Sequence, residues 1–132
     1  MLKLSRKTEY ALMALRHLHG KAAGELTSSK EIAGTYNIPG ELLAKTLQLL
    51  AREGLVETVQ GPHGGYRLKA DLATVCLADF MEMLEGPVAL TDCSIDKGCD
   101  QQRTCTIRTP IHRINDTMKT VFSNVTLAEV MQ

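Results

Sequence analysis

Apolar residues recur at helical spacing near the start of the chain. From about Ser5 to Gly20 they follow the three- and four-residue steps of an amphipathic helix, and Gly20 ends the pattern. Further on, Ser28 precedes Glu31 by three residues, the spacing of a capping box in which each side chain accepts a hydrogen bond from the other residue's backbone amide. This spacing predicts a short second helix that runs to about Tyr36.

A third helix is expected to follow closely. Asn37 suits the left-handed end of the second helix, and Pro39 is predicted at the first position of the third, where proline is best tolerated. Leucines recur on one face of this segment, which ends at Gly54, and small or polar residues occupy the other. The apolar face carries Leu43, Leu47 and Leu50, and the opposite face carries Gly40, Glu41, Ala44, Lys45 and Gln48.

Two short strands are predicted next, over residues 55–60 (LVETVQ) and 66–70 (YRLKA), joined by the glycine-rich tip GPHGG at 61–65. Two helices joined by a short turn and followed by a hairpin outline a winged helix-turn-helix. The fold class is therefore mainly α with a small β-hairpin wing, and residues 1–70 form the winged helix-turn-helix region.

The remaining residues, 71–132, predict further helices. One is expected from Leu77 to Glu85, closed by Gly86, and a last long helix opens at Thr109-Pro110. Its apolar residues alternate by three and four, the narrow seam of a helix that packs on another helix: Ile111, Ile114, Met118 and Val121. Thr126 is expected to cap a final helical turn.

Composition is that of one ordinary globular domain, with 44% hydrophobic and 23% charged residues in 132. The first twenty residues are interrupted by charges and hold no secretory signal, and no apolar run is long enough to span a membrane. These features predict a soluble cytoplasmic protein, in which thiols stay reduced.

Charge divides unevenly between the two halves. Residues 1–70 carry ten Lys and Arg against six acids, a net +4, and residues 71–132 carry five against nine, a net −4. A basic first half favours a polyanionic partner.

Double-stranded DNA is the predicted partner, because the polar face of the third helix would enter the major groove. There Lys45 and Gln48 can read base edges and Glu41 can accept from a cytosine amine. In the hairpin tip Gly64 permits close backbone approach, and His63 and Arg67 lie where a wing meets the minor groove or phosphates.

Three of the four cysteines, Cys93, Cys99 and Cys105, lie in one polar stretch with five residues between neighbours. Zinc sites usually pair ligands two to four residues apart, whereas these longer gaps suit a loop around a larger object such as an iron–sulfur cluster. Thiol sensing of oxidants, zinc ligation and a small iron–sulfur electron carrier stay open as alternatives. The fourth cysteine, Cys76, is expected to be a small buried hydrophobe.

A cluster needs a fourth ligand, for which His112 and Glu9 are candidates. An enzyme is not predicted, because the sequence shows no nucleophile with a paired base, no phosphate loop and no HExxH metal pair.

The chain as a whole resembles the Rrf family of bacterial iron–sulfur transcription regulators, of the IscR, NsrR and RirA type. The resemblance is carried by LSRKTEYAL (4–12), by IPGELLAKTLQLLAREGLVETVQGPHGGYRL (38–68), by LEGPVALTDC (84–93) and by the three cysteines in C-x5-C-x5-C order. It implies a homodimeric winged-helix repressor or activator whose last long helices pack across the dimer. It also implies that residues 71–132 are the cysteine-loop sensor and dimerisation region, packed with the first region as one domain.

The resemblance further implies a 2Fe–2S or 4Fe–4S cluster on the cysteine loop, and control of genes for cluster assembly or for iron, redox or nitric oxide responses. IscR-like members use a His three residues after the third Cys, where this chain has Arg108, which cannot ligate. NsrR-like members use an acid before the Tyr of the first helix, given by the partner subunit, and Glu9 matches it. A Glu that sets target choice in IscR-like members corresponds to Ala44.

Overall fold

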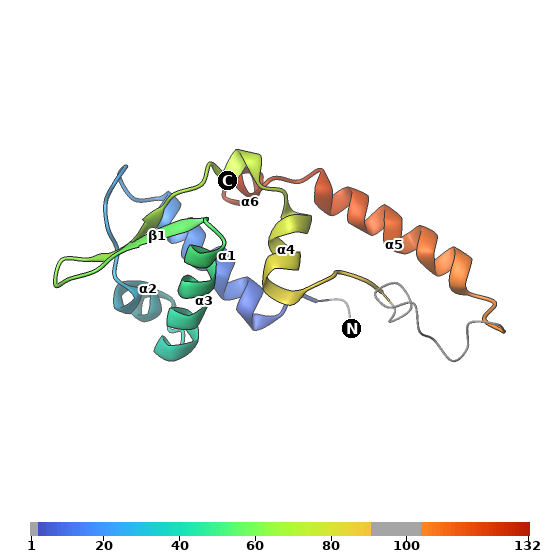
Figure 1. Ribbon diagram of the computed structural model, residues 1–132, viewed down its shortest axis with the longest axis horizontal. Helices are drawn as coiled ribbons and strands as arrows, with labels where there is room; N and C mark the ends of the chain where they lie inside the picture. Colours follow the sequence, from blue (N-terminus) through green and yellow to red (C-terminus); the bar gives the residue numbers. More distant parts are fainter. Residues whose placement is uncertain (1–2, 91–103) are drawn as a thin grey trace. The chain divides into compact units, whose positions relative to one another are not determined.

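The computed structural model describes residues 3–90 and 104–132 (Figure 1). In chain order the elements are α1 (Arg6–His19), α2 (Ser29–Tyr36), α3 (Gly40–Arg52), β1 (Val56–Val59), β2 (Gly65–Leu68), the 3-10 turn η1 (Leu72–Thr74), α4 (Leu77–Glu85), α5 (Arg108–Ser123) and α6 (Leu127–Val130). Lys3–Leu72 with Met131 form one compact unit, and Ala73–Val130 with Gln132 form a second. No described helix combines the length and hydropathy needed to cross a bilayer.

In the first unit α1 forms as the sequence predicts. Ser5 caps it by accepting the amide of Thr8 at 3.2 Å, and Gly20 follows its last residue. Its buried face carries Ala11, Ala14, Leu15 and Leu18, which lie in the core against α3. A continuous buried face makes α1 the support on which the helix-turn-helix rests.

The helix-turn-helix consists of α2, a short turn and α3. Ser28 accepts the amide of Glu31 at 3.1 Å, and Asn37 adopts the predicted left-handed conformation with φ of 54°. Pro39 lies one position earlier than expected, at the N-cap of α3, a shift within the usual uncertainty of helix ends. The predicted leucines of α3 are completely buried: Leu43, Leu47 and Leu50.

The wing is an antiparallel hairpin in which Val56 pairs with Leu68 and Val59 with Gly65. Thr27 adds an isolated bridge to Tyr66, with backbone hydrogen bonds of 2.9 and 2.8 Å. A Cβ on Gly65 would lie 2.7 Å from the carbonyl oxygen of Thr27, and φ at this residue is +155°. The bridge therefore requires glycine at this position.

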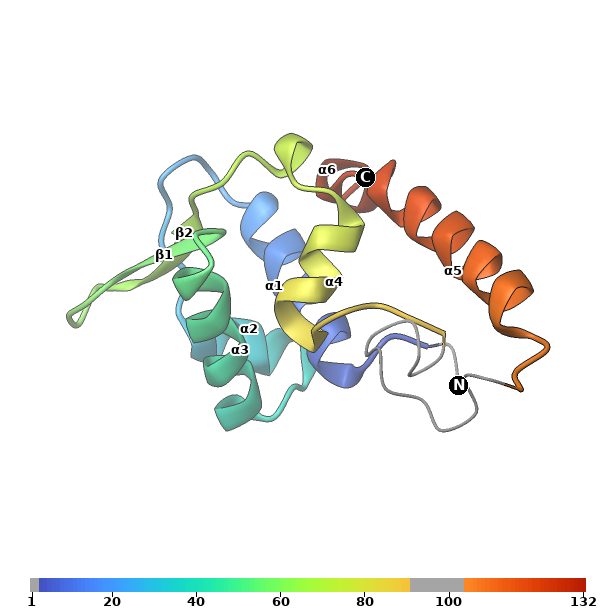
Figure 2. The same cartoon turned by 45° about the vertical axis from the view of Figure 1, so that its right-hand side comes forward.

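The second unit contains α4, α5 and α6, and Figure 2 shows α5 as one long helix. An isolated bridge between Cys76 and Thr126 joins the chain before α4 to the chain before α6, and the amide of Leu77 donates to the carbonyl of Val125 at 2.8 Å. Thr126 and Glu129 accept each other's amides, so the predicted cap of the last turn is confirmed.

Two expectations for this unit need correction. The last helix begins at Arg108, ahead of the predicted Thr109-Pro110. Cys76 is half-buried and does not belong to the core, because it is the N-cap residue of α4 and the strand-like bridge holds it at the edge of the unit.

Candidate nucleic-acid interface and cysteine site

The exposed face of α3 presents most of the residues predicted to contact DNA. Glu41, Lys45 and Gln48 are exposed, and Ala44 is half-buried. Arg52 is also exposed and continues the same face, since it follows Glu41 by eleven residues, three helical turns. Arg52 was not among the predicted contacts, although its spacing from Glu41 could have revealed it.

Two large apolar side chains near the predicted DNA-binding face are also exposed. Leu42, in the first turn of α3, is 36% exposed, and Val59, at the end of β1, is 39% exposed. Neither was among the predicted contacts, because a hydrophobic pattern assigns such residues to a core.

In the wing, His63 is exposed at the tip and Gly64 is half-buried. A Cβ on Gly64 would lie 1.9 Å from the carbonyl oxygen of Val59, so this turn excludes any larger residue. Arg67 is directly opposite Glu57 in the register, and its Nε donates to that carboxylate. The guanidinium carries further N–H donors, so Arg67 can hold Glu57 and still donate to a phosphate.

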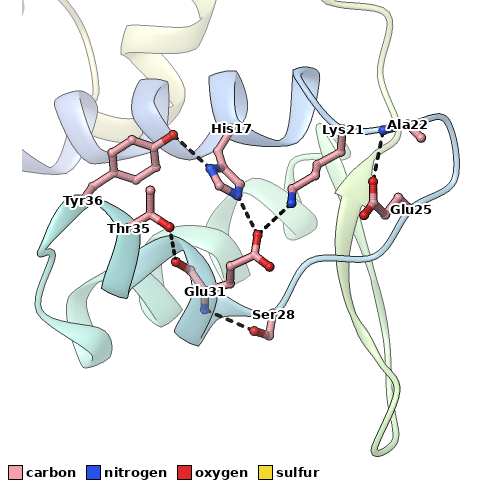
Figure 3. A network of polar contacts seen from close by, with 8 residues as sticks. All are labelled: His17, Lys21, Ala22, Glu25, Ser28, Glu31, Thr35 and Tyr36. Atoms are coloured by element: carbon pink, nitrogen blue, oxygen red, sulfur yellow. Dashed lines mark hydrogen bonds and ion pairs between the residues drawn. The ribbon is translucent and has the colours of Figure 1, made fainter.

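A polar network joins α1 to α2 (Figure 3). The Nε2 atom of His17 lies 2.8 Å from a carboxylate oxygen of Glu31, and its Nδ1 atom lies 2.9 Å from the hydroxyl of Tyr36. Lys21 reaches the same Glu31 oxygen at 2.9 Å. Glu31 thus serves this network, and the second half of the predicted capping box does not form.

The network changes the titration of two of its members. Hydrogen bonds from His17 and Lys21 hold the pKa of the Glu31 carboxyl below its ordinary value. The hydrogen bond to Glu31 raises the pKa of Lys21 above its ordinary value. The position of α2 is therefore linked to α1 by charge as well as by the edge-on contact between the His17 and Tyr36 rings.

The cysteine site is only partly within the described residues. Cys93 and Cys99 lie outside them, while Cys105 is half-buried, forms no disulfide and precedes the start of α5 by three residues. Within residues 3–90 and 104–132, no three His, Cys, Asp or Glu side chains gather into a metal site.

Two candidate fourth ligands have defined surroundings. Glu9 lies in the first turn of α1, and its side chain, 45% exposed, forms an ion pair of 3.8 Å with Arg6. His112 is half-buried in the second turn of α5, and Arg108 is the exposed first residue of that helix.

The exposed side of α5 carries an apolar stripe. Ile107, Ile114 and Val121 recur at seven-residue intervals and are 58%, 55% and 54% exposed. Ile111 and Met118, predicted for the same seam, are half-buried. Ile107 was not predicted, although it continues the spacing of Ile114 by one heptad toward the N-terminus.

A protein family and several solved structures match nearly the full length of this chain. A family model, Rrf2, described as iron-dependent transcriptional regulator, matches residues 4–132. The solved structure of CymR, the global cysteine regulator of B. subtilis, is 30% identical, with a TM-score of 0.76, and the match covers 99% of this chain and 97% of that one.

Two further structures extend the comparison. The oxidized form of CymR from Staphylococcus aureus is 26% identical with a TM-score of 0.73, and the match covers 99% of this chain and 97% of that one. IscR of T. potens is 23% identical with a TM-score of 0.73, covering 98% and 86% of the two chains, and this likeness concerns the fold alone. The matching family is thus described as one of transcriptional regulators, and the B. subtilis neighbour is named a global cysteine regulator.

Proposed function

The chain belongs to the Rrf2 family of transcriptional regulators, and from this membership we propose that it is a homodimeric operator-binding protein whose DNA affinity is set by an iron–sulfur cluster. The observation that carries the cluster is the set of three cysteines, Cys93, Cys99 and Cys105, evenly spaced in a chain that matches a family described as iron-dependent. Such a regulator works in the cytoplasm, where bacterial operators lie.

Support for DNA binding comes from the exposed face of α3 and from the wing. Lys45, Gln48 and Arg52 offer donors to base edges or phosphates along one helix face. The tip residue His63 and the tight turn at Gly64 make the hairpin suited to approach the minor groove. Recognition helices of two subunits would then meet half-sites about 34 Å apart.

Support for a homodimer comes from the α5 stripe. Three large apolar side chains that are more than half exposed at heptad spacing, Ile107, Ile114 and Val121, are typical of a helix that packs against a second helix. A second copy of α5 would remove this stripe from water, and the half-buried Ile111 and Met118 border it.

The donor set fits an iron–sulfur cluster. Cysteine thiolates are the common ligands of such clusters, three of them would leave one position for a fourth ligand, and Cys105 has a free thiol that burial leaves partly accessible. Either a 2Fe–2S or a 4Fe–4S cluster would match this number of cysteines. When bound, the cluster supplies a group that iron supply, oxygen or nitric oxide can alter.

Glu9 of the partner subunit is the proposed fourth ligand. Its present ion pair with Arg6 is long and exposed, so giving it up costs little. Arg108 occupies the place of the IscR-like histidine and stays protonated, which leaves that ligand set incomplete. His112 is the alternative within the same chain.

A thiol-based sensor without a cluster is the second candidate. The likeness to CymR, named a global cysteine regulator and also solved in an oxidized form, favours it. Zinc on the same cysteines would be a variant of this function. The third alternative, an electron carrier, is not proposed, because the family consists of transcriptional regulators.

The deciding experiment is purification without oxygen, followed by an absorption spectrum and by assays of iron and acid-labile sulfide. About two of each per protomer indicates a 2Fe–2S cluster and about four of each a 4Fe–4S cluster. A colourless protein, even after reconstitution with iron and sulfide, contradicts the cluster and leaves the thiol sensor, for which operator affinity should change on peroxide treatment.

The fourth ligand is tested by Glu9→Ala, with Glu53→Ala as the matched removal of an exposed acid. We expect the first variant to hold less iron and to lose the cluster-dependent change in operator affinity, while the second behaves as the wild type. Unchanged iron content in Glu9→Ala would point to His112 instead.

A further inference from the structure

Asn115 is a buried polar residue with a specific partner. Four polar residues are buried among those described, and three of them, Thr8, Thr27 and Thr46, belong to the first unit. Asn115 belongs to the second, is 4% exposed, and accepts the backbone amide of Leu90 on its Oδ1 atom at 3.0 Å. This bond joins residues that are 25 positions apart.

Asn115 is a polar residue among apolar neighbours on α5. Ile111 lies four positions before Asn115, Met118 three positions after it and Phe122 seven positions after it. All three lie on the same side of the helix as Asn115 and are half-buried. An apolar side chain would suit this position better if packing alone mattered. Asn115 instead accepts a hydrogen bond from the backbone amide of Leu90, a half-buried residue.

Leu90, the partner of Asn115, lies close in sequence to the three cysteines. Leu90 follows the end of α4 and precedes Cys93 by three residues, while Cys105 precedes Arg108, the first residue of α5, by three. Two described residues beside the cysteine segment, Leu90 and Cys105, are therefore both attached to α5. One attachment is the chain itself and the other is the Asn115–Leu90 hydrogen bond.

We propose that Asn115 is a positioning residue of the cysteine segment, which holds Leu90 on α5 so that both ends of the segment share one helix. The proposal rests on the cluster function proposed above. It also connects that function with the α5 stripe, because Ile114, the residue before Asn115, belongs to the exposed face of the same helix. A change in the cysteine segment would thus reach the helix proposed for dimerisation.

Two substitutions separate positioning from folding. Asn115→Leu removes the acceptor but leaves an apolar side chain of similar size in a position bordered by apolar residues, and Asn115→Asp retains an oxygen acceptor. Thr117→Ala is the matched control, because its hydroxyl is exposed and donates only within α5, to the carbonyl of Arg113 at 2.9 Å. Helical circular dichroism and dimer mass report whether each variant is folded.

The first readout is hydrogen exchange of the Leu90 amide in the cluster-free protein. We expect exchange roughly tenfold faster or more in Asn115→Leu, with near wild-type rates in Asn115→Asp and Thr117→Ala. The second readout is the half-life of the cluster in the whole protein exposed to an iron chelator. This half-life should fall severalfold in Asn115→Leu and recover in Asn115→Asp.

Each outcome has a clear meaning. A folded Asn115→Leu dimer with faster Leu90 exchange but a wild-type cluster half-life would overturn the proposal and leave Asn115 a structural residue. Unchanged Leu90 exchange would overturn it at the first step. A wild type that never takes up iron and sulfide would instead refute the cluster function itself, a result visible before any variant is compared.

Discussion

The imidazole of His17 in α1 lies 2.8 Å from the carboxylate of Glu31 in α2, and it holds the first helix of the helix-turn-helix to its support. Because a carboxylate only accepts hydrogen bonds, Nε2 of His17 must be the donor, which leaves Nδ1 to meet the Tyr36 hydroxyl at 2.9 Å. The His17 side chain is only 13% exposed, so few waters compete for these contacts.

Acid should weaken this link through Glu31. Its pKa is lowered by hydrogen bonds from His17 and Lys21, so the folded protein favours the ionised carboxylate. The resulting stability is present above the ordinary carboxyl pKa of about 4.3 and is lost as pH falls through the lower folded value. Glu31→Gln should therefore melt below the wild type at neutral pH, and the difference should vanish in acid.

Melting curves between neutral pH and strong acid measure this effect, with Glu53→Gln as the exposed control. The raised pKa of Lys21 affects stability at alkaline pH. The stability that Lys21 contributes is present below the ordinary lysine pKa and is lost as pH rises through the higher folded value. A Glu31→Gln deficit that is the same at every pH would show that charge is not its cause.

Substitution of Gly65 should disrupt the wing where β2 lies against Thr27. In Gly65→Ala the new methyl group would collide with the backbone of Thr27, so we expect a loss of roughly 1–3 kcal/mol in unfolding free energy and weaker operator binding. Gly34→Ala is the matched control, because Gly34 lies in α2 with open space around it. That control should gain about 0.5–1 kcal/mol from helix propensity, and denaturant unfolding measures both.

Charge placed on the α5 stripe should dissociate the proposed dimer. Each apolar side chain of this size contributes about 1.5–3 kcal/mol when fully buried, so Ile114→Asp with Val121→Asp should raise the dimer dissociation constant roughly a hundredfold or more. Thr120→Asp adds a charge to another exposed face of the same helix and should leave the dimer intact. Sedimentation over a range of concentrations measures the dimer dissociation constant of the double variant and of Thr120→Asp. A double variant that remains dimeric would place the interface elsewhere.

Lys45 should contribute to sequence discrimination. Lys45→Ala removes a donor from the exposed face of α3, and the loss of one base contact costs about 1–3 kcal/mol against the operator and less against a scrambled duplex. Arg113→Ala removes one exposed positive charge from α5 and serves as the matched control. Equal losses on both duplexes in Lys45→Ala would mean that Lys45 contacts phosphate only.

Local chemistry explains why the helices and the wing were predictable. Ser28, Asn37 and Thr126 act through neighbours within a few residues, and the leucine periodicity of α3 is a property of one helix. Helix ends shifted by a residue or two at Pro39 and Thr109, because several residues near an end can accept the cap role. Cys76 was misplaced, since its bridge to Thr126 depends on a segment fifty residues away.

The sequence by itself determined the order of elements, the winged helix-turn-helix and the grouping of three cysteines, because periodicity, caps and turns are written in short stretches of chain. Only the tertiary structure decided the partners of Glu31 and Asn115 and the exposure of Ile107, Ile114 and Val121. Each of these depends on which distant residue packs nearby, and no local pattern encodes that choice.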